Sequence, residues 1–427
     1  MKAPTRPARP GTRPVPLLLL VGALALPSPL VRAADAVPVQ LGPRPFYLVE
    51  RLPSGALRER LSDCAAETRE YRPSDFSIGH RGAALQFPEH TAESYRAAAR
   101  TGAGIVECDV TFTADAELVC RHAQCDLHTT TNILTTPLAE TCSVPFTPAV
   151  FDADGELRSP ATARCCASDL ALAEFKSLEG KMDAADSHAT TPEEYLGGTP
   201  AFRTDLYATG GTLLSHAESI ALIGSLGAKF TPELKGVTDG FGESGLDRGR
   251  LARRMLDEYV EAGVPAKDVW PQSFYVEDIR LWLRDYPELA RQAVLLDGRD
   301  PFELAESPPT VAEFEALAAE GLGIVAPPMP TLLAIEDGEI VASEYARNAK
   351  AAGLDIIAWS LERAGRIDED VRPADGAYYH DTTVEALDGD GAILRTLDAL
   401  AREVGVVGVF SDWPATTTFY ANCFGLD

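Results

Sequence analysis

Short β-like runs that alternate with helical patterns constrain the fold of this chain more than any other feature. Nine such runs occur between Phe76 and Asp412. They read "FSIGH", "GIVECDV", "ELVCRH", "AKFTPELK", "DVWPQSF", "QAVLLDG", "GIVAPP", "LDIIAWSL" and "VVGVFSD". Intervening segments such as "GRLARRMLDEYVEAGV" carry apolar residues at helical spacing and end near a glycine. Because strands that alternate with helices form parallel sheets, we predict an α/β fold. Eight or nine strands over this length favour a (β/α)8 TIM barrel.

One long stretch, from about Gln124 to Thr209, interrupts this alternation. It is rich in Thr, Pro, Asp, Ala and Gly, and it contains four of the eight cysteines. Unstructured loops of that length are uncommon inside a compact domain. We therefore predict an inserted, disulfide-containing subdomain at 124–209, within a barrel domain that spans 74–427.

The first 33 residues have the layout of a secretory signal peptide. Basic residues precede the apolar run "PVPLLLLVGALALPSPL", and small residues follow it in "VRAADA". The run is too short and too rich in proline to form a typical membrane-spanning helix. We therefore expect cleavage after Ala33 or Ala34 and export, either to a periplasm or to the extracellular space. Residues 34–73 are read as a polar lead-in, and no later segment indicates a membrane anchor.

The eight cysteines are interpreted as disulfide partners, because an even number in an exported chain is typical of disulfide bonding. The chain has no CxxC pair, which disfavours a zinc site. Two local bridges are plausible from spacing. One joins Cys142 to Cys165 or Cys166, and the other joins Cys120 to Cys125.

Carboxylates gather near the carboxyl ends of two predicted strands, which is where chemistry collects in a barrel. Glu107 and Asp109 in "ECD" are two residues apart, so they share one face of a strand and Cys108 points away. Glu233 in "ELK" shares a face with Lys235 in the same way. Carboxylates that converge inside a barrel repel one another. A hard divalent cation bound by Glu107, Asp109 and Glu233 would relieve that repulsion, whereas a structural ion-pair cluster is the alternative.

Two histidines and an arginine follow the strands that flank the carboxylate strand. His80 and His122 could divide the work of general base and general acid near neutral pH. Arg81 offers a planar fork that suits phosphate oxygens. Together with Lys235 and a metal, these groups indicate phosphoryl chemistry.

These residues occur in an ordered series that resembles the glycerophosphodiester phosphodiesterase family. The series reads "GHRGAALQFPEHT", "GAGIVECDVTFTADAELVCRH", "FTPELK", "AWSL" and "VGVFSDWP", from residue 76 to about 416. The resemblance implies a distorted (β/α)8 barrel in which a short turn, without a helix, links the second and third strands. It also implies metal-dependent hydrolysis of glycerophosphodiesters to an alcohol and glycerol 3-phosphate, with Ca²⁺ or Mg²⁺.

The same resemblance implies a role for each matching residue. His80 and His122 match the acid/base pair, Glu107, Asp109 and Glu233 match the metal ligands, Arg81 and Lys235 match the phosphate contacts, Glu89 matches a residue that lines the site, and Trp359 matches an aromatic wall beside the glycerol moiety.

The expected partner is a small phosphodiester. The formal net charge of −26 disfavours nucleic acid and anionic membrane surfaces. Two other functions stay open at this point. One is a phospholipase-D-like phosphodiesterase that acts on lipid headgroups, and the other is a non-catalytic exported binding protein. The second is less favoured, because no histidine or carboxylate of the series is lost.

Overall fold

The computed structural model of the protein describes residues 1–2, 37–204, 210–236, 246–374 and 377–427. The chain divides into two units, 1–34 and 35–427. Nearly all of the predicted signal peptide lies outside the described residues, and all the described helices and strands belong to the second unit. Within the described ranges, every helix is too short or too polar to cross a lipid bilayer.

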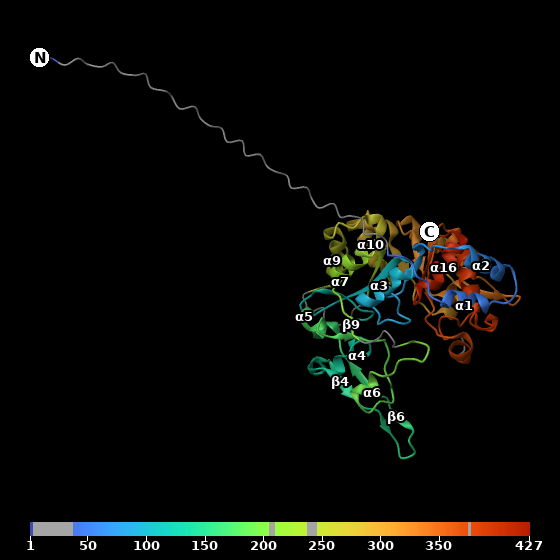
Figure 1. The fold of residues 1–427 in the computed structure, drawn as a ribbon, viewed down its shortest axis with the longest axis horizontal. Helices are drawn as coiled ribbons and strands as arrows, with labels where there is room; N and C mark the ends of the chain where they lie inside the picture. The colour runs from blue at the N-terminus through green and yellow to red at the C-terminus, as the bar shows by residue number, and fades with distance from the viewer. Residues whose placement is uncertain (3–36, 205–209, 237–245, 375–376) are drawn as a thin grey trace. The chain divides into compact units, whose positions relative to one another are not determined.

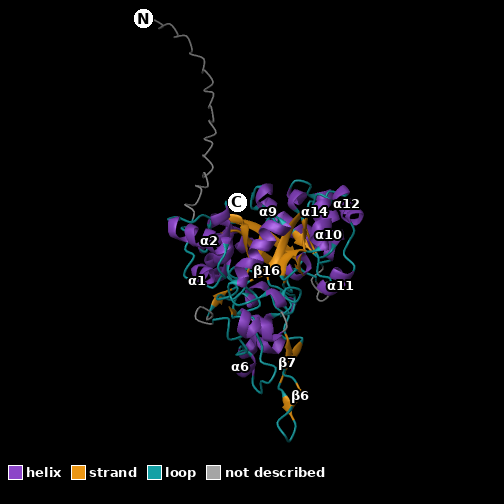
Figure 2. Ribbon diagram, turned by 90° about the vertical axis from the view of Figure 1, so that its right-hand side faces the viewer, coloured by secondary structure: helices purple, strands orange, loops and turns teal. Residues whose placement is uncertain are grey.

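Eight parallel strands form a closed ring, because β1 pairs with both β17 and β2. The ring runs through β1 (Ser74–Gly79), β17 (Gly408–Ser411), β16 (Asp355–Leu361), β13 (Ile324–Ala326), β12 (Val294–Leu296), β11 (Gln272–Ser273), β10 (Lys229–Leu234) and β2 (Ala103–Phe112). Figure 2 shows the strands surrounded by helices. The predicted (β/α)8 barrel is confirmed, and each of the nine predicted runs contains a strand.

Helices on the outside of the ring supply most of the remaining core. They are α3 (Ala92–Arg100), α7 (His216–Ser225), α9 (Arg248–Glu261), α10 (Val276–Asp285), α11 (Pro301–Glu306), α12 (Val311–Ala319), α13 (Met329–Leu332), α14 (Glu344–Ala351), α15 (Ala392–Asp398) and α16 (Pro414–Phe424). A hairpin of β14 (Leu333–Glu336) and β15 (Glu339–Ala342) lies between α13 and α14. The α7 helix begins with a capping box, in which the Ser215 hydroxyl accepts a hydrogen bond from the backbone N–H of Glu218.

The barrel is irregular next to β2, where β3 (Leu118–Cys120) pairs with it in the antiparallel direction. A turn without a helix links the two strands, as the resemblance implied. Because β3 runs backwards along β2, the chain that follows it returns to the level of the buried carboxylates. The backbone N–H of Arg121 donates to the carbonyl oxygen of Asp109 at 2.8 Å. This reversal places His122 near the barrel mouth.

The chain between β3 and α7 forms small elements with a hydrophobic cluster of their own. The elements are α4 (Leu127–Thr130), β4 (Val144–Thr147), β5 (Val150–Phe151), β6 (Leu157–Ser159), β7 (Thr162–Arg164), α5 (Leu172–Phe175), β8 (Glu179–Gly180), α6 (Pro192–Tyr195) and β9 (Gly211–Thr212). Most are drawn in green in Figure 1. Leu127, Ile133, Phe175 and Tyr195 are buried together in this cluster. The insertion is therefore structured.

All eight cysteines form disulfides: Cys64–Cys423, Cys108–Cys120, Cys125–Cys166 and Cys142–Cys165. The bridge from Cys142 to Cys165 was one of the predicted alternatives. The predicted bridge from Cys120 to Cys125 is wrong. Cys120 lies opposite Val110 in the β2–β3 pair, so its side chain shares a face with Cys108, two residues along β2.

The segment read as a polar lead-in forms two helices, α1 (Arg44–Glu50) and α2 (Ala56–Glu67). Leu48, Val49 and Leu61 from these helices are buried in the main core. The Cys64–Cys423 bridge ties α2 to α16. The few apolar residues of this segment therefore pack in the main core, which its polar composition did not indicate.

Candidate active site

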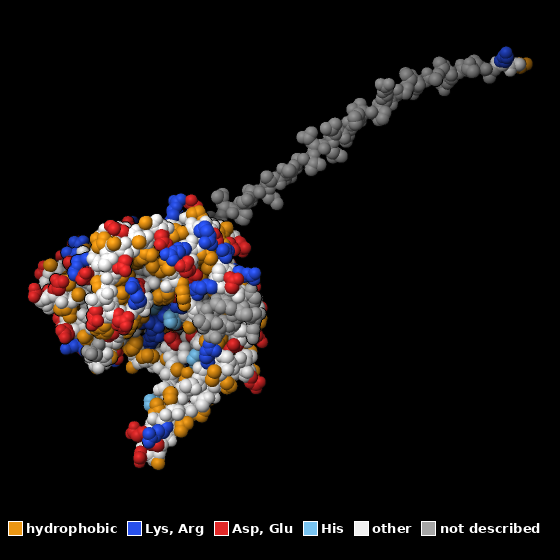
Figure 3. Space-filling view, turned by 180° about the vertical axis from the view of Figure 1, so that it is seen from behind, with side chains coloured by type: hydrophobic (Ala, Val, Ile, Leu, Met, Phe, Trp, Pro, Cys, Tyr) orange, Lys and Arg blue, Asp and Glu red, His pale blue; other side chains and the backbone are white. Residues whose placement is uncertain are grey.

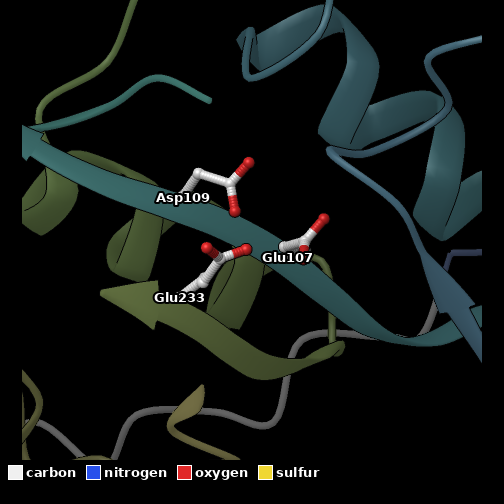
Figure 4. Close-up of side chains that lie close together, drawn as sticks. All are labelled: Glu107, Asp109 and Glu233. Carbon is white, nitrogen blue, oxygen red and sulfur yellow. The ribbon is translucent and has the colours of Figure 1, made fainter. Parts of the chain in front are cut away.

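Three carboxylates converge inside the barrel. Glu107 and Asp109 project from β2, and Glu233 projects from β10, where it is directly paired with Asp109 (Figure 4). All three are buried, and one oxygen of each lies within 4.8 Å of the others. Cys108 faces the opposite way, into its disulfide. The structure thus brings together the three residues that the sequence proposed as metal ligands.

The electrostatics of this cluster favour a bound cation. Burial, together with the charges of Asp109 and Glu233, raises the pKa of Glu107 well above its ordinary value. Burial also raises the pKa of Glu233, to about 7. For Asp109, burial is outweighed by Lys235 and His90, so its pKa is lowered. The Oδ1 atom of Asp109 is buried and has no hydrogen-bond partner among the described atoms. Three such oxygen donors fit a hard divalent cation such as Ca²⁺ or Mg²⁺.

Two neighbouring side chains hold the carboxylates in place. The Nε2 atom of His90 is 2.9 Å from Oδ2 of Asp109, and its Nδ1 atom is 3.1 Å from the Tyr95 hydroxyl. The amide of Gln272 donates to Oε1 of Glu107 at 2.8 Å. Sequence reasoning assigned no role to His90 or Gln272. The sequence offered only a weak signal for these two residues, namely that His90 stands in the same short segment as Glu89.

His80 follows β1 and contacts a carboxylate that follows β17. Its Nδ1 atom lies 2.6 Å from Oδ1 of Asp412. Its Nε2 atom lies 3.8 Å from Oε2 of Glu107 and 3.4 Å from the Ser360 hydroxyl. Burial lowers the pKa of His80 to about 4, although Asp412 opposes the shift. A proton on Nδ1 donated to Asp412 therefore leaves Nε2 as an acceptor that faces the carboxylates.

Asp412 is itself held by two arginines, of which Arg203 is buried and Arg363 is half-buried. Its Oδ2 atom lies 3.0 Å from Nη1 of Arg363 and 3.2 Å from Nη2 of Arg203. Burial would raise the pKa of Asp412, but Arg363 and His80 lower it well below its ordinary value. Arg203 belongs to the insertion, which therefore reaches the residues behind His80. The sequence placed Asp412 at a strand end, in "SDWP", without giving it a role, and it did not point to Arg203 or Arg363.

Arg81 occupies a strained position directly after His80. Its φ angle is +54°, and its backbone N–H donates to Oε2 of Glu107 at 2.9 Å. At Gly82 the φ angle is +96°, and an added Cβ would lie 2.3 Å from the Ser94 hydroxyl, so a side chain has no room here. Glu89 was predicted to line the site. It is not among the residues that line the active-site cavity described next, and its carboxylate instead lies 3.0 Å from Nη1 of Arg81, which it supports.

All the other predicted site residues line one cavity of about 280 Å³. It is lined by His80, Arg81, Glu107, Asp109, His122, Glu233, Lys235, Gln272, Phe274, Leu296, Trp359, Arg363, Tyr379 and Phe410. Figure 3 shows a hollow in which Lys and Arg side chains lie beside His. Lys235 is 2.7 Å from Glu233. The ring of Trp359 lies 6.2 Å from Phe274 and 6.3 Å from Tyr379, which gives the cavity an aromatic part.

Comparisons with known proteins relate this chain to phosphodiesterases. Residues 80–216 match the model of the "Glycerophosphoryl diester phosphodiesterase family". A chain of Arthroderma benhamiae named "Extracellular protein" is 43% identical over 250 residues, which are 57% of this chain and 100% of the relative. "Probable glycerophosphodiester phosphodiesterase 1" of Mycobacterium tuberculosis is 51% identical over 47 residues, 11% of this chain and 17% of the relative.

The fold is also found among solved structures. A protein from Silicibacter pomeroyi, assigned to the glycerophosphoryl diester phosphodiesterases, matches with a TM-score of 0.50 and 18% identity. The match covers 83% of this chain and 95% of that one. It supports the barrel architecture.

Proposed function

The chain belongs to the glycerophosphoryl diester phosphodiesterase family of phosphoric diester hydrolases, and we propose that it hydrolyses glycerophosphodiesters to an alcohol and glycerol 3-phosphate. The observation that carries the proposal is the composition of the cavity. The cavity is lined by three buried carboxylates, two imidazoles and the cationic groups of Arg81, Lys235 and Arg363. This set matches the needs of phosphoryl transfer, in which an anionic centre is held, neutralised and supplied with proton acceptors and donors.

Glu107, Asp109 and Glu233 are the residues proposed to hold Ca²⁺ or Mg²⁺. When bound by these three carboxylates, such an ion would supply Lewis-acid chemistry and would offset the charge of the phosphoryl oxygens. Arg81 and Lys235 act on the same oxygens through charge-assisted hydrogen bonds. We assign Glu89 to holding the Arg81 guanidinium, because the two groups are paired and buried.

His80 is proposed as the proton acceptor. Asp412 fixes its ring, so that Nε2 takes a proton from the attacking oxygen, either water or a hydroxyl of the substrate. His122 is then left to protonate the departing alcohol. Trp359 offers an aromatic surface beside which the glycerol moiety is placed.

Export of the protein is part of the proposal. Four disulfides suit an oxidising compartment, and the Arthroderma benhamiae relative is named an extracellular protein. A folded, disulfide-bonded enzyme would then meet its small phosphodiester substrates outside the cytoplasm.

The direct test measures glycerol 3-phosphate released from glycerophosphocholine by metal-stripped protein, and by protein supplied with Ca²⁺ or Mg²⁺. Release that depends on a divalent cation is the expected result. The His80→Ala and His122→Ala variants should lose activity by orders of magnitude while their circular dichroism is unchanged. Near-normal turnover in both variants would contradict the assignment. Absence of release with every cation would instead favour another substrate or a binding protein.

A further inference from the structure

The N-terminal helix α1 lies against the C-terminal part of the barrel, although the two are far apart in the sequence. It packs against α15 and α16 (Figure 1). The helix stands outside residues 80–216, which match the family model, and its residues do not line the active-site cavity. Its polar side chains nevertheless reach the segment between β16 and α15. We call residues 362–374 and 377–391 the mouth loop, because they include Arg363 and Tyr379 of the cavity wall.

Arg44 of α1 holds the first residue of the mouth loop. Its Nε atom donates to the two carboxylate oxygens of Glu362 at 3.0 and 2.9 Å, and its Nη2 atom also donates to one of them. The two residues are 318 apart in the sequence. The Glu362 side chain is only 1% exposed, and the hydroxyl of Thr416 on α16 donates to it as well. A buried carboxylate at the end of β16 is thus bound by both α1 and α16.

The backbone of Glu362 has a conformation that depends on such contacts. Its φ angle is +64°, a left-handed value that is uncommon for a residue other than glycine. Conformations of this kind persist where the surrounding structure determines them, and they are frequent at active sites. The next residue is Arg363, whose Nη1 atom lies 3.0 Å from Oδ2 of Asp412. The turn that Arg44 holds therefore directs Arg363 toward the carboxylate that orients His80.

The same helix holds the far end of the mouth loop. The Tyr47 hydroxyl donates to Oδ2 of Asp390 at 3.0 Å, and Oδ1 of Asp390 accepts from the backbone N–H of Ile367 at 3.0 Å. Asp390 thus joins the beginning of the loop to its end. A Cβ on Gly391 would lie 2.5 Å from the carbonyl oxygen of Arg51, so α1 and the loop approach each other closely here. Helix α1 therefore contacts the mouth loop at both ends.

The part of the mouth loop around Tyr379 forms a wall of the cavity. The ring of Tyr379 lies 5.0 Å from that of Tyr378 and 6.3 Å from that of Trp359. Ala377 and Tyr378 have left-handed φ angles of +45° and +52°, outside any helix or strand. Because regular secondary structure does not fix this part, its position depends on how the two ends of the loop are held.

We propose that α1 is a clamp on the mouth loop, and that Arg44 and Tyr47 are positioning residues for the active site. The clamp sets the places of Arg363 and Tyr379 in the cavity. The catalytic part of this proposal rests on the proposed phosphodiesterase function. Because Arg363 both supports Asp412 and lines the cavity, a released loop would disturb the orientation of the catalytic histidine and the binding of the phosphodiester.

Hydrogen–deuterium exchange tests the clamp without reference to activity. Arg44→Ala should raise exchange in mouth-loop peptides about tenfold, since the loop opens locally, while the barrel strands exchange as in the natural protein. The matched control is Arg58→Ala on α2. Arg58 is also half-buried, and it donates to the Leu52 carbonyl oxygen within the same N-terminal segment. Mouth-loop exchange that is unchanged in Arg44→Ala, or raised equally by the control, would overturn the clamp.

Steady-state kinetics on glycerophosphocholine test the catalytic part. Arg44→Ala should lower kcat/KM about tenfold, with a fall in kcat, because groups around the reacting atoms are misplaced. Arg44→Lys should restore part of the loss, since an ammonium keeps the charge without the planar fork. Glu362→Gln should resemble Arg44→Ala, and the double variant should lose no more than either one, because both break the same contact. Arg58→Ala should keep the natural kcat/KM.

The two measurements separate the possible failures. Natural kcat and KM in Arg44→Ala, together with faster exchange in its mouth loop, would overturn the positioning role. A loss that Arg44→Lys does not reduce at all would also contradict it. If the natural protein releases no glycerol 3-phosphate with any cation, the proposed function is overturned instead, and the exchange result still decides whether α1 holds the loop.

Discussion

Each residue around His80 has a separate physical task. Asp412 accepts from Nδ1 of His80 through one oxygen and receives two guanidinium groups at the other. The carboxylate is therefore kept ionised in a buried place, and the ring of His80 is kept in one orientation. Nε2 faces the carboxylate cluster as a consequence. The orientation of His80 thus depends on Asp412, which itself lies outside the cavity lining.

Asp412→Asn is expected to lower kcat by about 10²–10⁴-fold, because an amide can hold the His80 ring with the proton on the wrong nitrogen. KM should change little, since Asp412 does not line the cavity. Steady-state kinetics on glycerophosphocholine check this split. Asp154→Asn, at an exposed turn of the insertion, is the matched control. Equal loss from both substitutions would show a general effect on folding.

Arg203→Ala is expected to lower kcat about tenfold, because it removes one of two charge-assisted bonds to Asp412, each worth roughly 1.5–3 kcal/mol. Arg203→Lys should restore part of the activity, and added guanidinium ion should rescue the alanine variant. Arg158→Ala, an exposed arginine of the same insertion, is the control. If guanidinium has no effect on Arg203→Ala, the arginine supports the fold and not the orientation of His80.

The decisive element is the antiparallel β2–β3 pair. The reversal at β3 carries His122 back toward the carboxylates, and the Cys108–Cys120 bridge fixes the two strands on their outer face. This bridge stands directly behind the strand that bears Glu107 and Asp109. The β2–β3 pair therefore links the stability of the fold to the positions of the carboxylates on β2 and of His122 after β3.

Replacement of Cys108 and Cys120 by Ala is expected to lower the free energy of unfolding by about 2–4 kcal/mol and also to lower kcat. The stability loss follows from the freed chain, and the activity loss follows from a looser His122. Denaturant unfolding and turnover on glycerophosphocholine are the measurements. Replacement of Cys64 and Cys423 by Ala should destabilise the protein while leaving kcat nearly unchanged in the folded fraction. A similar fall of kcat in both pairs would contradict the local role.

The sequence predicted the strand elements well, because each barrel strand is a short apolar run with a polar end. The antiparallel direction of β3 was not predicted: the family resemblance implied only a short turn before it, and an apolar triplet such as Leu118–Cys120 pairs equally well in either direction. The α1 and α2 helices were missed, because their buried residues are few and pack against distant parts of the chain. The Cys120 bridge was predicted wrongly for a related reason. Spacing along the chain does not report which face of a strand a side chain occupies after pairing.

At the scale of the whole molecule, the proposed site depends on contacts between distant segments. His80 and Asp412 are 332 residues apart, and Arg203 and Asp412 are 209 apart. The sequence identified the groups that stand on strand ends, including all three carboxylates. It did not identify groups such as Arg203, whose position depends on how the insertion folds back. Closure of the barrel, through the pairing of β1 with β2 and β17, is what brings these ends together.

The buried carboxylates also make the stability of the whole barrel depend on a cation. Without one, Glu107 and Glu233 are buried with raised pKa values, so their ionisation opposes folding at neutral pH. A cation that binds only the folded state adds about 2.7 kcal/mol when present at 100 times its dissociation constant. We therefore expect Ca²⁺ or Mg²⁺ to raise the Tm of metal-stripped protein by a few degrees in differential scanning calorimetry.

Glu233→Gln separates this effect from nonspecific stabilisation by salt. Removing one carboxylate relieves repulsion, so the metal-stripped variant should be more stable than the natural protein at neutral pH. Because a cation ligand is lost at the same time, the rise of Tm with Ca²⁺ or Mg²⁺ should nearly vanish. Glu336→Gln, an exposed glutamate on β14, should retain the full rise. A rise of Tm that is the same in all three proteins would mean that the ion binds elsewhere, and the carboxylate cluster would then be an ion-pair network with Lys235.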